Sequence, residues 1–376
     1  MARTGHRAIG FAAAAARRGP GLRMADFPTS LDEIGARQIG QWLAERFPGT
    51  AVTGLDRGTV IHGTATKAEY FLRYNVAGTA HGLPPSLWLK CGLDTQIPEQ
   101  APHSTIEAQF FRDLAPLLAI NLPRPFATAI APGLSSGIVL YEDLNRRPVR
   151  FGTQTQPLSH DAMLDVLELL AELHAAFWRS EQVARFDWLR PGGVNHSNGV
   201  IDRFIDFWDL AAGWPRFVHV PDSLRDKERM RAAIKTVLAS DMADPVCVIH
   251  GDPHQGNMFF DVGDRPGLLD WATVMRGHWA WDVAYAMIGS QTVSQRRARE
   301  GEQLAHYLGR LRSLGVDAPN IADARREYAR HAIWIFLFAL CPPELQPEEL
   351  CTLSAERACA AIVDLDTLAL IESASR

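Results

Sequence analysis

The stretch VCVIHGDPHQGN at residues 246–257, followed by GLLDW at residues 267–271, is the part of this chain that decides its fold. Val246–Ile249 and Gly267–Leu269 are short apolar runs, and each predicts a buried strand. Polar residues begin directly after both runs. Side chains placed just past strand ends lie at the rim of a cleft, where water and small molecules reach them. The two runs therefore predict a polar site at the edge of a cleft.

Three oxygen-bearing side chains belong to this predicted site, namely Asp252, Asn257 and Asp270. A hard cation such as Mg²⁺ prefers oxygen ligands and needs few of them from the protein, because phosphates and water fill the other positions. We therefore predict that Asn257 and Asp270 hold Mg²⁺ and that Asp252 accepts a proton. Asp, Asn and Gly also form ordinary turns, so a plain loop is the alternative.

A zinc hydrolase is a second alternative, since His250, Asp252 and His254 alternate in a way that presents ligands to a metal. Zinc sites need three or four well-placed ligands with a supporting shell of hydrogen bonds. No further His or Cys follows at ligand spacing, and His278, the nearest, has no partner beside it in the sequence. The pattern thus favours magnesium over zinc.

The order His-Gly-Asp, then Asn five residues after the Asp, then Asp-Trp, resembles the aminoglycoside phosphotransferase and choline kinase group, including its ecdysteroid-kinase-like branch. The resemblance implies an α+β, bilobal, protein-kinase-like fold with a small, mostly antiparallel-β N-lobe and a larger α-helical C-lobe. It makes Asp252 the catalytic base, Asn257 and Asp270 the Mg²⁺ ligands, and His250 a brace of the catalytic loop. It also implies ATP, or GTP, as the phosphate donor.

A kinase site needs a phosphate clamp upstream, and LWLK at residues 87–90 is an apolar run that ends in lysine. The chain uses Arg for most of its basic residues, and its lysines are Lys67, Lys90, Lys227 and Lys235. Ammonium is compact and fits a narrow slot beside two phosphates better than the wider guanidinium does. We predict that Lys90 contacts the nucleotide phosphates, with a surface lysine at a strand end as the alternative.

Glu107 lies in the segment STIEAQFFRDL, residues 104–114, and is placed to pair with Lys90 from a helix that packs on the strand. Ser104 and Glu107 also fit a capping box at the start of that helix. The related family carries a Glu followed by aromatic residues and Leu-Ala-Pro at this point. The resemblance therefore favours the ion pair in addition to the cap.

Residues 57–73 read as two strands around a small, hydroxyl-rich turn. Such a hairpin can fold over phosphates, because small residues let backbone amides approach an anion closely. We expect the donors near Gly63 and Thr64. The three spaced glycines of protein kinases are missing, so an ordinary hairpin is the alternative.

Residues 137–144, GIVLYEDL, form an apolar strand that turns polar at its end. In the related fold the hinge binds adenine with main-chain groups, which implies contacts from the Glu142 carbonyl and the Leu144 amide. Without the resemblance, the segment is only a strand with an acidic end.

Asp161–Trp178 carries a wide apolar stripe at helical spacing and predicts a helix buried within a helical lobe, with Ser159 as its cap. His174 on this helix is expected in the core or the cleft wall rather than as a ligand. The segment around Asp282 resembles the family segment whose Asp anchors the catalytic loop. We therefore expect a structural role for Asp282.

Residues 26–141 are predicted as an N-terminal nucleotide-binding lobe, mostly β with one important helix, and residues 142–376 as a helical C-terminal catalytic and substrate lobe. Pro123–Pro132 is expected to connect that helix to the hinge strand. Residues 1–25, rich in Ala and Arg, are expected to be a disordered extension without a role in the fold. A targeting peptide is the alternative, and Met24 is a second candidate for the start of translation.

The five cysteines are scattered, which argues against disulfides and zinc and for a reducing, cytoplasmic location. The formal net charge is −5 and no basic tract is present, so nucleic acid is not an expected partner. The longest apolar run, His331–Cys341, is too short to span a bilayer, so no membrane partner is expected. It predicts a buried C-lobe helix that ends before Pro342.

The signatures His-Arg-Asp and Ala-Pro-Glu are missing, which disfavours a protein substrate and leaves a small-molecule hydroxyl as the expected acceptor. By the resemblance, the walls of the acceptor site are expected to come from Phe186–Val218, Trp271–Trp281 and the last helices. The first two stretches hold Trp188, Trp208, Trp214, Trp279, Trp281, Asp202, Asp206 and Asp209. Such residues suit an amine through cation–π attraction, or they merely pack the lobe, so an apolar alcohol and a polycation both stay open. A protein that binds nucleotide without turnover is the remaining alternative.

Overall fold

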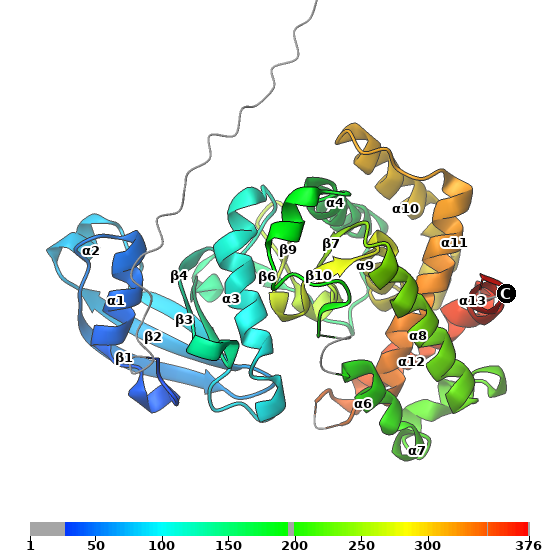
Figure 1. Cartoon of the computed structure of the whole chain (residues 1–376), viewed down its shortest axis with the longest axis horizontal. Coiled ribbons are helices and arrows are strands. Elements are labelled where there is room, and N and C mark those ends of the chain that lie inside the picture. Colours follow the sequence, from blue (N-terminus) through cyan, green and yellow to red (C-terminus); the bar gives the residue numbers. More distant parts are fainter. Residues whose placement is uncertain (1–26, 195–198, 344, 375–376) are drawn as a thin grey trace, which may run out of the picture.

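The computed structural model describes residues 27–194, 199–343 and 345–374 of the 376-residue chain. They form a sheet-rich part, the N-lobe, and a larger helical part, the C-lobe (Figure 1). This confirms the predicted α+β fold class. The predicted extension at residues 1–25 lies outside the described residues.

The N-lobe sheet has five antiparallel strands in the order β1-β2-β3-β5-β4. Their bounds are β1 Val52–Ile61, β2 Thr66–Tyr74, β3 Ser86–Cys91, β4 Pro125–Ile130 and β5 Gly137–Glu142. The predicted hairpin is present as β1 and β2. Strand β3 carries Lys90 and pairs with β2 on one side and β5 on the other, so this lysine lies in the middle of the sheet.

Strand β4 corrects one prediction, because Pro123–Pro132 holds a strand and not only a connection. Its prolines favoured a loop, since proline has no amide hydrogen for a strand ladder. β4 lies at the edge of the sheet and pairs with β5 alone. An edge strand tolerates proline, and Pro125 is its first residue.

Three helices accompany the sheet where the sequence predicted one: α1 (Ala36–Arg46), α2 (Val76–Ala80) and α3 (His103–Asp113). Helix α1 packs on β1 and β4 and buries Trp42 in the N-lobe core. Helix α3 packs on β4 and β5 and also reaches the short 3₁₀ helix η11, Trp271–Thr273. There the Phe110 ring stacks on the Trp271 ring with centroids 3.9 Å apart. Helix α3 thus joins the two lobes.

The predicted capping box of Ser104 and Glu107 is wrong. Helix α3 begins at His103, so Ser104 already lies in its first turn, whereas a capping box needs the hydroxyl before the first helical residue. Ser104 Oγ instead donates to Ala101 O at 2.5 Å and accepts from Gly137 N at 2.8 Å. The hydroxyl thereby ties the start of α3 to the start of β5, and Glu107 is left for another partner.

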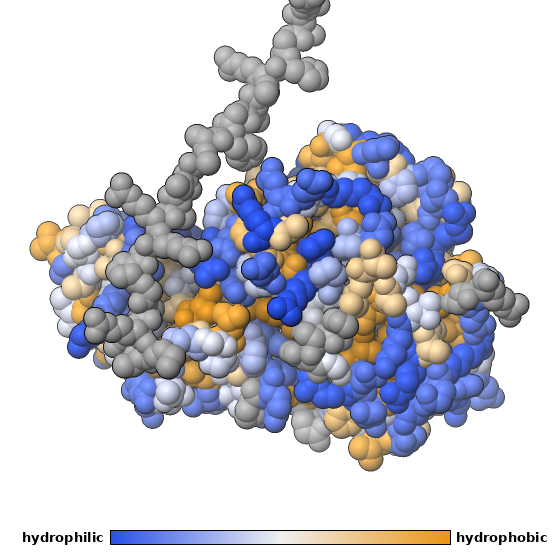
Figure 2. All heavy atoms as spheres, viewed as in Figure 1, coloured by the Kyte–Doolittle hydropathy of each residue, from blue (hydrophilic) through white to orange (hydrophobic). Residues whose placement is uncertain are grey.

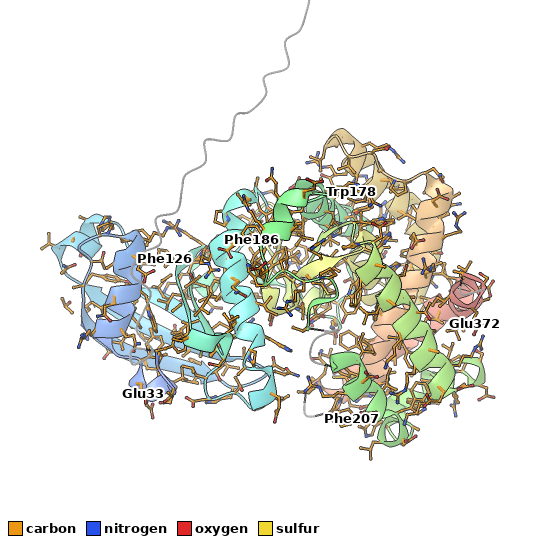
Figure 3. All side chains as sticks on the ribbon, in the orientation of Figure 1. Glu33, Phe126, Trp178, Phe186, Phe207 and Glu372 are labelled. Carbon is orange, nitrogen blue, oxygen red and sulfur yellow. The ribbon has the colours of Figure 1, made fainter. Side chains whose placement is uncertain are left out.

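The C-lobe is built from α4 (His160–Ala176), α6 (Val200–Asp206), α7 (Trp208–Ala211), α8 (Lys227–Ala243), α9 (Trp279–Gly289), α10 (Val293–Ser313), α11 (Ile321–His331), α12 (Glu348–Asp364) and α13 (Thr367–Ala374). Helix α4 confirms the helix predicted at Asp161–Trp178, and the Ser159 hydroxyl accepts from Ala162 N as its cap. The helix predicted in His331–Cys341 is present as a buried 3₁₀ helix, η12 (Ala332–Leu340). In Figure 3, Phe126 marks β4 in the N-lobe and Phe207 marks the junction of α6 and α7.

Five short strands lie near the middle of the molecule: β6 (Arg150–Phe151), β7 (Cys247–Ile249), β8 (Met258–Phe260), β9 (Pro266–Leu268) and β10 (Met275–Gly277). Strand β7 pairs with β10, and β6, β8 and β9 form a second small sheet. Strands β7 and β9 confirm the two buried strands that the sequence predicted. Each ends where a polar segment begins.

Among the described residues, no helix combines the length and the apolar character needed to cross a membrane. All five cysteines are buried thiols outside any disulfide, as their scattered positions predicted. The face shown in Figure 2 is largely hydrophilic, and apolar side chains gather near its middle, where the two lobes meet.

Candidate active site

The loop after β7 turns sharply and is held by one buried carboxylate. Gly251 has a φ of +85°, and a Cβ atom there would lie 2.6 Å from Thr273 O, so only glycine fits this turn. Asp282 on α9 accepts hydrogen bonds from His250 N at 2.7 Å and from Gly251 N at 2.9 Å. Two successive backbone amides of the loop are thus bound by the same side chain.

Asp282 is fully buried and is also fixed from the side of α4. His174 Nε2 lies 3.2 Å from Asp282 Oδ2, and His174 Nδ1 lies 2.7 Å from the Tyr307 hydroxyl. Hydrogen bonds to a charged group are stronger than neutral ones, so this chain holds the loop firmly. The anchoring role predicted for Asp282 is confirmed, and His174 belongs to the core.

His250 joins the loop to the end of β9. Its Nδ1 atom accepts from Asp252 N at 3.2 Å, and its Nε2 atom therefore carries the proton and donates to Leu269 O at 2.8 Å. Both ring nitrogens are occupied, so the side chain orients the residues around it and is not placed to react. The loop residue Asp252 and the segment before Asp270 are held at a fixed separation in this way.

Asp252 and Asn257 face each other across the loop. Asn257 Nδ2 donates to Asp252 O at 3.0 Å and to Asp252 Oδ2 at 3.1 Å, so the amide nitrogen points to the loop and the amide oxygen is directed elsewhere. Burial raises the pKa of Asp252 above its ordinary value, against the opposing effects of His254 and His250. A carboxylate with a raised pKa is a better proton acceptor near neutral pH.

Lys90 bridges three elements of the structure. Its Nζ atom lies 2.7 Å from Glu107 Oε2 on α3 and 2.8 Å from Asp270 Oδ1 after β9, which confirms the predicted ion pair. Glu107 Oε1 also accepts from Trp271 N at 3.2 Å. Burial lowers the pKa of Lys90, but Asp270 and Glu107 outweigh burial and keep it raised, so the side chain is a cation.

Asp270 has φ +60° and ψ +73°, in the left-handed region that few residues other than glycine adopt. Such backbone strain is typical of functional positions. Burial raises the pKa of Asp270, but Lys90 and Lys67 outweigh burial and lower it well below its ordinary value. A permanent carboxylate here and the amide oxygen of Asn257 form a donor set that fits Mg²⁺.

A cavity of about 400 Å³, the hinge cavity, opens between the sheet and the C-lobe. Its lining comprises Ile61, Lys67, Trp88, Leu89, Lys90, Glu107, Phe111, Pro123, Tyr141, Glu142, Leu144, Asn145, Phe151, Gly256, Asn257, Leu269 and Asp270. The predicted hinge residues Glu142 and Leu144 are among them. The Glu142 carboxylate accepts from Arg124 N at 2.9 Å and from Arg147 Nη1 at 2.8 Å, so this side chain is used within the protein.

The turn between β1 and β2 contributes less to the hinge cavity than predicted. Gly63 lines neither cavity of the site, and its carbonyl accepts from Gln96 N at 2.9 Å. Thr64 lines the second cavity, described below. Lys67, which the sequence did not assign, lines the hinge cavity and is the direct cross-strand neighbour of Lys90. Because the chain has only four lysines, the presence of one at position 67, close to Lys90 in the sequence, was a signal that could have identified it as a site residue.

A second cavity of about 400 Å³, the aromatic cavity, lies on the C-lobe side. Its apolar wall is formed by Val194, Phe204, Trp281, Tyr285, Trp334, Leu337, Phe338, Cys341 and Leu345. Asp252 lines this cavity and not the other, whereas Glu107, Asn257 and Asp270 line both. The two cavities therefore meet at these three residues.

The stretches that the sequence proposed do contribute to the wall, with Val194 and Phe204 from Phe186–Val218 and Trp281 from Trp271–Trp281, but few of the individual side chains named there line it. Of the five tryptophans considered, Trp281 alone lines the aromatic cavity. Asp202 pairs with Lys235 and Arg231, and Asp209 pairs with Lys227, outside the cavity lining. The run His331–Cys341 was expected to be only buried, but its helix η12 supplies a large part of the wall. Periodicity shows that a run is apolar, not which cavity it borders.

The zinc alternative finds no support in the loop, since both ring nitrogens of His250 are hydrogen bonded. His254 Nδ1 accepts from Gly256 N and contacts Gln154 Nε2, both at 3.0 Å. His254 Nε2 lies 3.6 Å from Asp252 Oδ2. His250 therefore has no ring nitrogen left for a metal, so the three-residue zinc set proposed from His250, Asp252 and His254 lacks one of its members.

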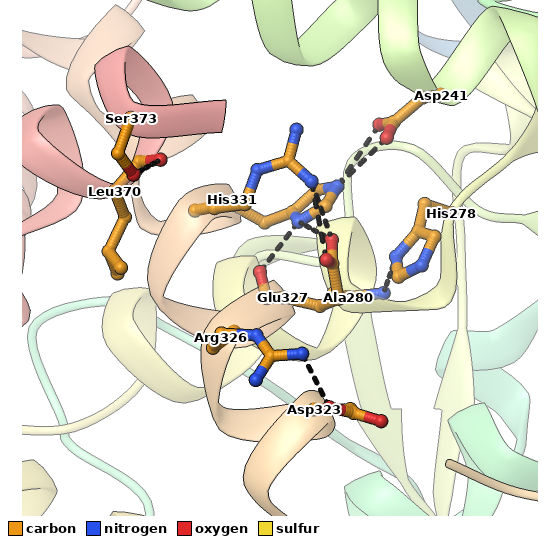
Figure 4. Close-up of polar contacts among 10 residues, drawn as sticks. Asp241, His278, Ala280, Asp323, Arg326, Glu327, His331, Leu370 and Ser373 are labelled. Atoms are coloured by element: carbon orange, nitrogen blue, oxygen red, sulfur yellow. Dashed lines mark hydrogen bonds and ion pairs between the residues drawn. The ribbon is translucent and has the colours of Figure 1, made fainter. Parts of the chain in front are cut away.

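His278, expected to be without a partner, lies beside His331 and Glu327, with candidate ligand atoms within 4.8 Å of one another. Figure 4 shows that His331 is already satisfied, because its Nδ1 atom lies 2.7 Å from Glu327 O and its Nε2 atom 3.0 Å from Asp241 Oδ1. Burial lowers the pKa of His331, but Asp241 outweighs burial and raises it. The cluster is therefore a hydrogen-bonded imidazolium with His278 stacked on it at 4.8 Å between ring centroids.

A lysine–glutamate pair in the N-lobe, an anchored His-Gly-Asp loop in the C-lobe and a cleft between them define a phosphotransferase with a protein-kinase-like fold. The model of the phosphotransferase enzyme family matches residues 54–318, which is more than half of the chain. This chain belongs to that family. The comparison with curated proteins finds no significant match.

Solved structures of similar fold cover most of the chain. A microcompartment-associated aminopropanol kinase is 14% identical, with 88% of this chain and 98% of that chain covered and a TM-score of 0.50. A GDP and kanamycin complex of an aminoglycoside phosphotransferase is 12% identical, covering 89% and 98%, with a TM-score of 0.46. A macrolide 2'-phosphotransferase from Brachybacterium faecium is 19% identical, covering 85% and 95%, with a TM-score of 0.43.

Proposed function

We propose that this protein transfers the γ-phosphate of ATP, or of GTP, to a hydroxyl group of a small molecule. The meeting of the two cavities supports this most strongly. Glu107, Asn257 and Asp270 line both cavities, while Asp252 lines only the aromatic one. A nucleotide in the hinge cavity would direct its phosphates towards Asp270, and an acceptor in the aromatic cavity would meet Asp252.

In this proposal, adenine lies against the hinge, where the Glu142 carbonyl and the Leu144 amide bind it. Lys90, braced by Glu107, contacts the phosphates, and its fixed charge needs no rearrangement when the phosphoryl group moves. The lobes divide after residue 141, so that the N-lobe binds nucleotide and the C-lobe carries catalysis and the acceptor. Thr64, from the turn between β1 and β2, reaches the region where both substrates meet.

Asp252 is the proposed base, which orients the acceptor hydroxyl and takes its proton. Its raised pKa and its place beside the aromatic cavity suit this role. Asn257 and Asp270 would hold Mg²⁺, which supplies charge neutralisation at the phosphates when bound. The protein itself keeps Asp270 ionised through Lys90 and directs the Asn257 amide oxygen away from the loop.

The alternative is a protein of the same fold that binds nucleotide without turnover. It would not need a base, yet Asp252 is held by His250 and Asn257 in a defined orientation. The geometry therefore favours an enzyme over a silent binding protein.

Mass spectrometry tests the proposal after the purified protein is incubated with Mg²⁺-ATP and pooled hydroxyl compounds, among them aminoglycosides, amino alcohols, nucleosides and sterols. We expect one compound to gain a phosphate in the presence of protein and not in its absence. Thermal unfolding with Mg²⁺-ATP and with Mg²⁺-GTP gives the nucleotide preference. If no compound gains phosphate and neither nucleotide stabilises the protein, the kinase proposal fails.

A further inference from the structure

The aromatic cavity lies next to the proposed base, and the chemistry of the residues that line it indicates what kind of acceptor it binds. Its wall on the C-lobe side is mostly aliphatic and aromatic, from Val194 and Phe204 to η12 and Leu345, with polar side chains on the catalytic loop and at Thr273 and Gln346. Resting on the proposed phosphotransferase function, we infer that the acceptor is an uncharged alcohol with an apolar ring or branched body, not an amine or an aminoglycoside. Three observations on the described residues carry this inference.

The first observation is the small number of carboxylates. Among the described residues, those lining the aromatic cavity are Glu107, Asp252 and Asp270. Lys90 Nζ lies 2.7 Å from Glu107 Oε2 and 2.8 Å from Asp270 Oδ1, so this ammonium offsets one of their two negative charges. Of the described lining carboxylates, Asp252 is the one without a lysine or arginine partner, and in the proposal it faces the hydroxyl that is to be phosphorylated. An acceptor with several ammonium groups would bury charges without partners, which is strongly unfavourable.

The second observation concerns the titratable and charged groups around the opening of the cavity. His103 lines the cavity, and burial together with Arg203 on α6 lowers its pKa to about 4, so it is neutral at physiological pH. Arg203 thus adds positive charge on this side. The acids Asp202 and Asp209, which a cationic acceptor would use, are paired with Lys235 and Lys227 and lie outside the lining. The electrostatic surroundings therefore disfavour a cation.

The third observation is the arrangement of the aromatic rings. Trp281 and Trp334 stack on each other with centroids 3.7 Å apart and planes at 24°, so each ring covers one face of the other. Trp281 Nε1 donates to Gly251 O at 3.0 Å. Cation–π binding needs an exposed ring face, and each of these two rings has one face covered by the other. They form a wall for apolar contact.

The wall continues up to the reacting position. The Phe338 ring lies 6.0 Å from the His254 ring and 5.9 Å from the Tyr285 ring, centroid to centroid. The Tyr285 hydroxyl is close enough to Asp252 to favour its charged form, and burial keeps that phenol protonated. An apolar body packed on Phe338 and Leu337 would leave its hydroxyl beside Asp252 and Tyr285. Transfer then forms the bond from the acceptor oxygen to γ-phosphorus, breaks the bond to the nucleoside diphosphate, and places the hydroxyl proton on Asp252.

Matched pairs of alcohols test this inference on the full-length protein with Mg²⁺-ATP. One pair is choline and its uncharged carbon isostere, and another is cyclohexylmethanol and its cationic piperidine counterpart, with kanamycin as a polycation. We expect kcat/KM for phosphate transfer to be at least about tenfold higher for the neutral member of each pair, because an unpaired ammonium loses its hydration in the cavity. Equal or better transfer to the cationic members, or to kanamycin, would overturn the inference and leave the kinase proposal standing.

Binding of the same alcohols, measured calorimetrically with a non-hydrolysable ATP analogue, covers the case in which none is phosphorylated. Tighter binding of the neutral members supports the inference, and tighter or equal binding of the cationic members, or binding of neither class, overturns it. Thermal stabilisation by Mg²⁺-ATP, measured on separate samples of the same protein preparation, reports on the kinase proposal independently. Its absence would count against the proposed function itself.

The variant Leu337→Ala tests the position of the apolar body. Shortening this side chain should raise KM for the neutral alcohol about tenfold and leave KM for ATP unchanged, since Leu337 lines only the aromatic cavity. Val262→Ala is the matched control, because Val262 is 81% exposed and borders neither cavity. An unchanged alcohol KM in a folded Leu337→Ala protein would contradict the proposed contact.

Discussion

The hinge cavity and the aromatic cavity have the same volume of about 400 Å³, yet they are built differently. The hinge cavity is lined at one end by lysines from neighbouring strands, Lys67 and Lys90, whose cationic groups suit an anion. The aromatic cavity is lined by rings from α9 and η12, and among its described lining carboxylates Asp252 is the one without a lysine or arginine partner. The comparison teaches that lysine side chains border the hinge cavity, which suits the phosphates of the proposed nucleotide, whereas apolar rings border the aromatic cavity, which suits the proposed alcohol.

The structure also separates the residues that serve one cavity from those that serve both. Lys90 borders the hinge cavity alone and Asp252 the aromatic cavity alone, whereas Asn257 and Asp270 border both. Substitutions at the first two positions should therefore change different kinetic constants. The predictions below test this separation.

The largest effect is expected for Asp252→Asn. The variant keeps the shape of the side chain and removes the proposed base, so kcat should fall by roughly 10²- to 10⁴-fold while the dissociation constant for ATP stays the same. Single-turnover kinetics and calorimetric ATP titration measure the two quantities. The control is Asp264→Asn, because Asp264 is 80% exposed and lies outside both cavities. Near-normal turnover in Asp252→Asn would reject the assignment of the base.

Lys90→Met should act on the other cavity. Loss of the preorganised ammonium should lower kcat/KM for ATP by about a hundredfold. It also leaves Glu107 and Asp270 without their cation, so the free energy of unfolding should fall by about 3–5 kcal/mol. Steady-state kinetics and urea unfolding measure these changes. Because Lys90 does not line the aromatic cavity, a variant in which only KM for the acceptor changed would contradict the assignment of Lys90 to the hinge cavity.

Lys67→Met is the matched substitution on the neighbouring strand, directly across from Lys90. Within the described part of the chain, no carboxylate bridges Lys67 as Glu107 and Asp270 bridge Lys90, so we expect about a tenfold rise in KM for ATP from the loss of one charge-assisted phosphate contact, with little effect on stability. The same kinetic assay compares the two lysines. An effect of Lys67→Met as large as that of Lys90→Met would show that the two lysines contribute equally to binding the nucleotide phosphates.

The smallest effect on activity is expected from the cluster around His331, which lines neither cavity. Asp241 raises the pKa of His331, so its stabilisation is fully present below the unfolded pKa of about 6.5 and is lost as pH rises through the folded pKa. His278 behaves oppositely, because burial and His331 lower its pKa, and its stabilisation is lost as pH falls below about 6.5.

Urea unfolding across this pH range measures both effects. His331→Gln should flatten the decline in unfolding free energy above about pH 6.5, and His278→Gln should flatten the decline below it. The kinetic constants for ATP and acceptor should be unchanged in both variants at neutral pH. A shift of either KM would mean that the cluster is coupled to the cavities.

Much of the site could be predicted because its residues lie close together in the sequence or follow strands directly. The spacing from His250 to Asn257 fits one loop, and a buried apolar run before each polar segment fixes where that loop must emerge. Lys90 at the end of an apolar run and Glu107 on the next helix follow the same logic, and the observed ion pair confirms it. Local order was sufficient here because short strands and tight turns leave few alternatives.

Other features depended on contacts between distant segments, which no local pattern contains. The edge position of β4 permits proline in a strand, and the exact start of α3 removes Ser104 from the capping position. The orientation of η12 against α9 decides that Trp334 and Phe338 face a cavity while Trp279 does not. The sequence alone thus determined the phosphotransferase loop and its lysine, because these are set by neighbouring residues. Only the tertiary structure decided the character of the acceptor wall, because packing selects which apolar side chains remain next to an opening.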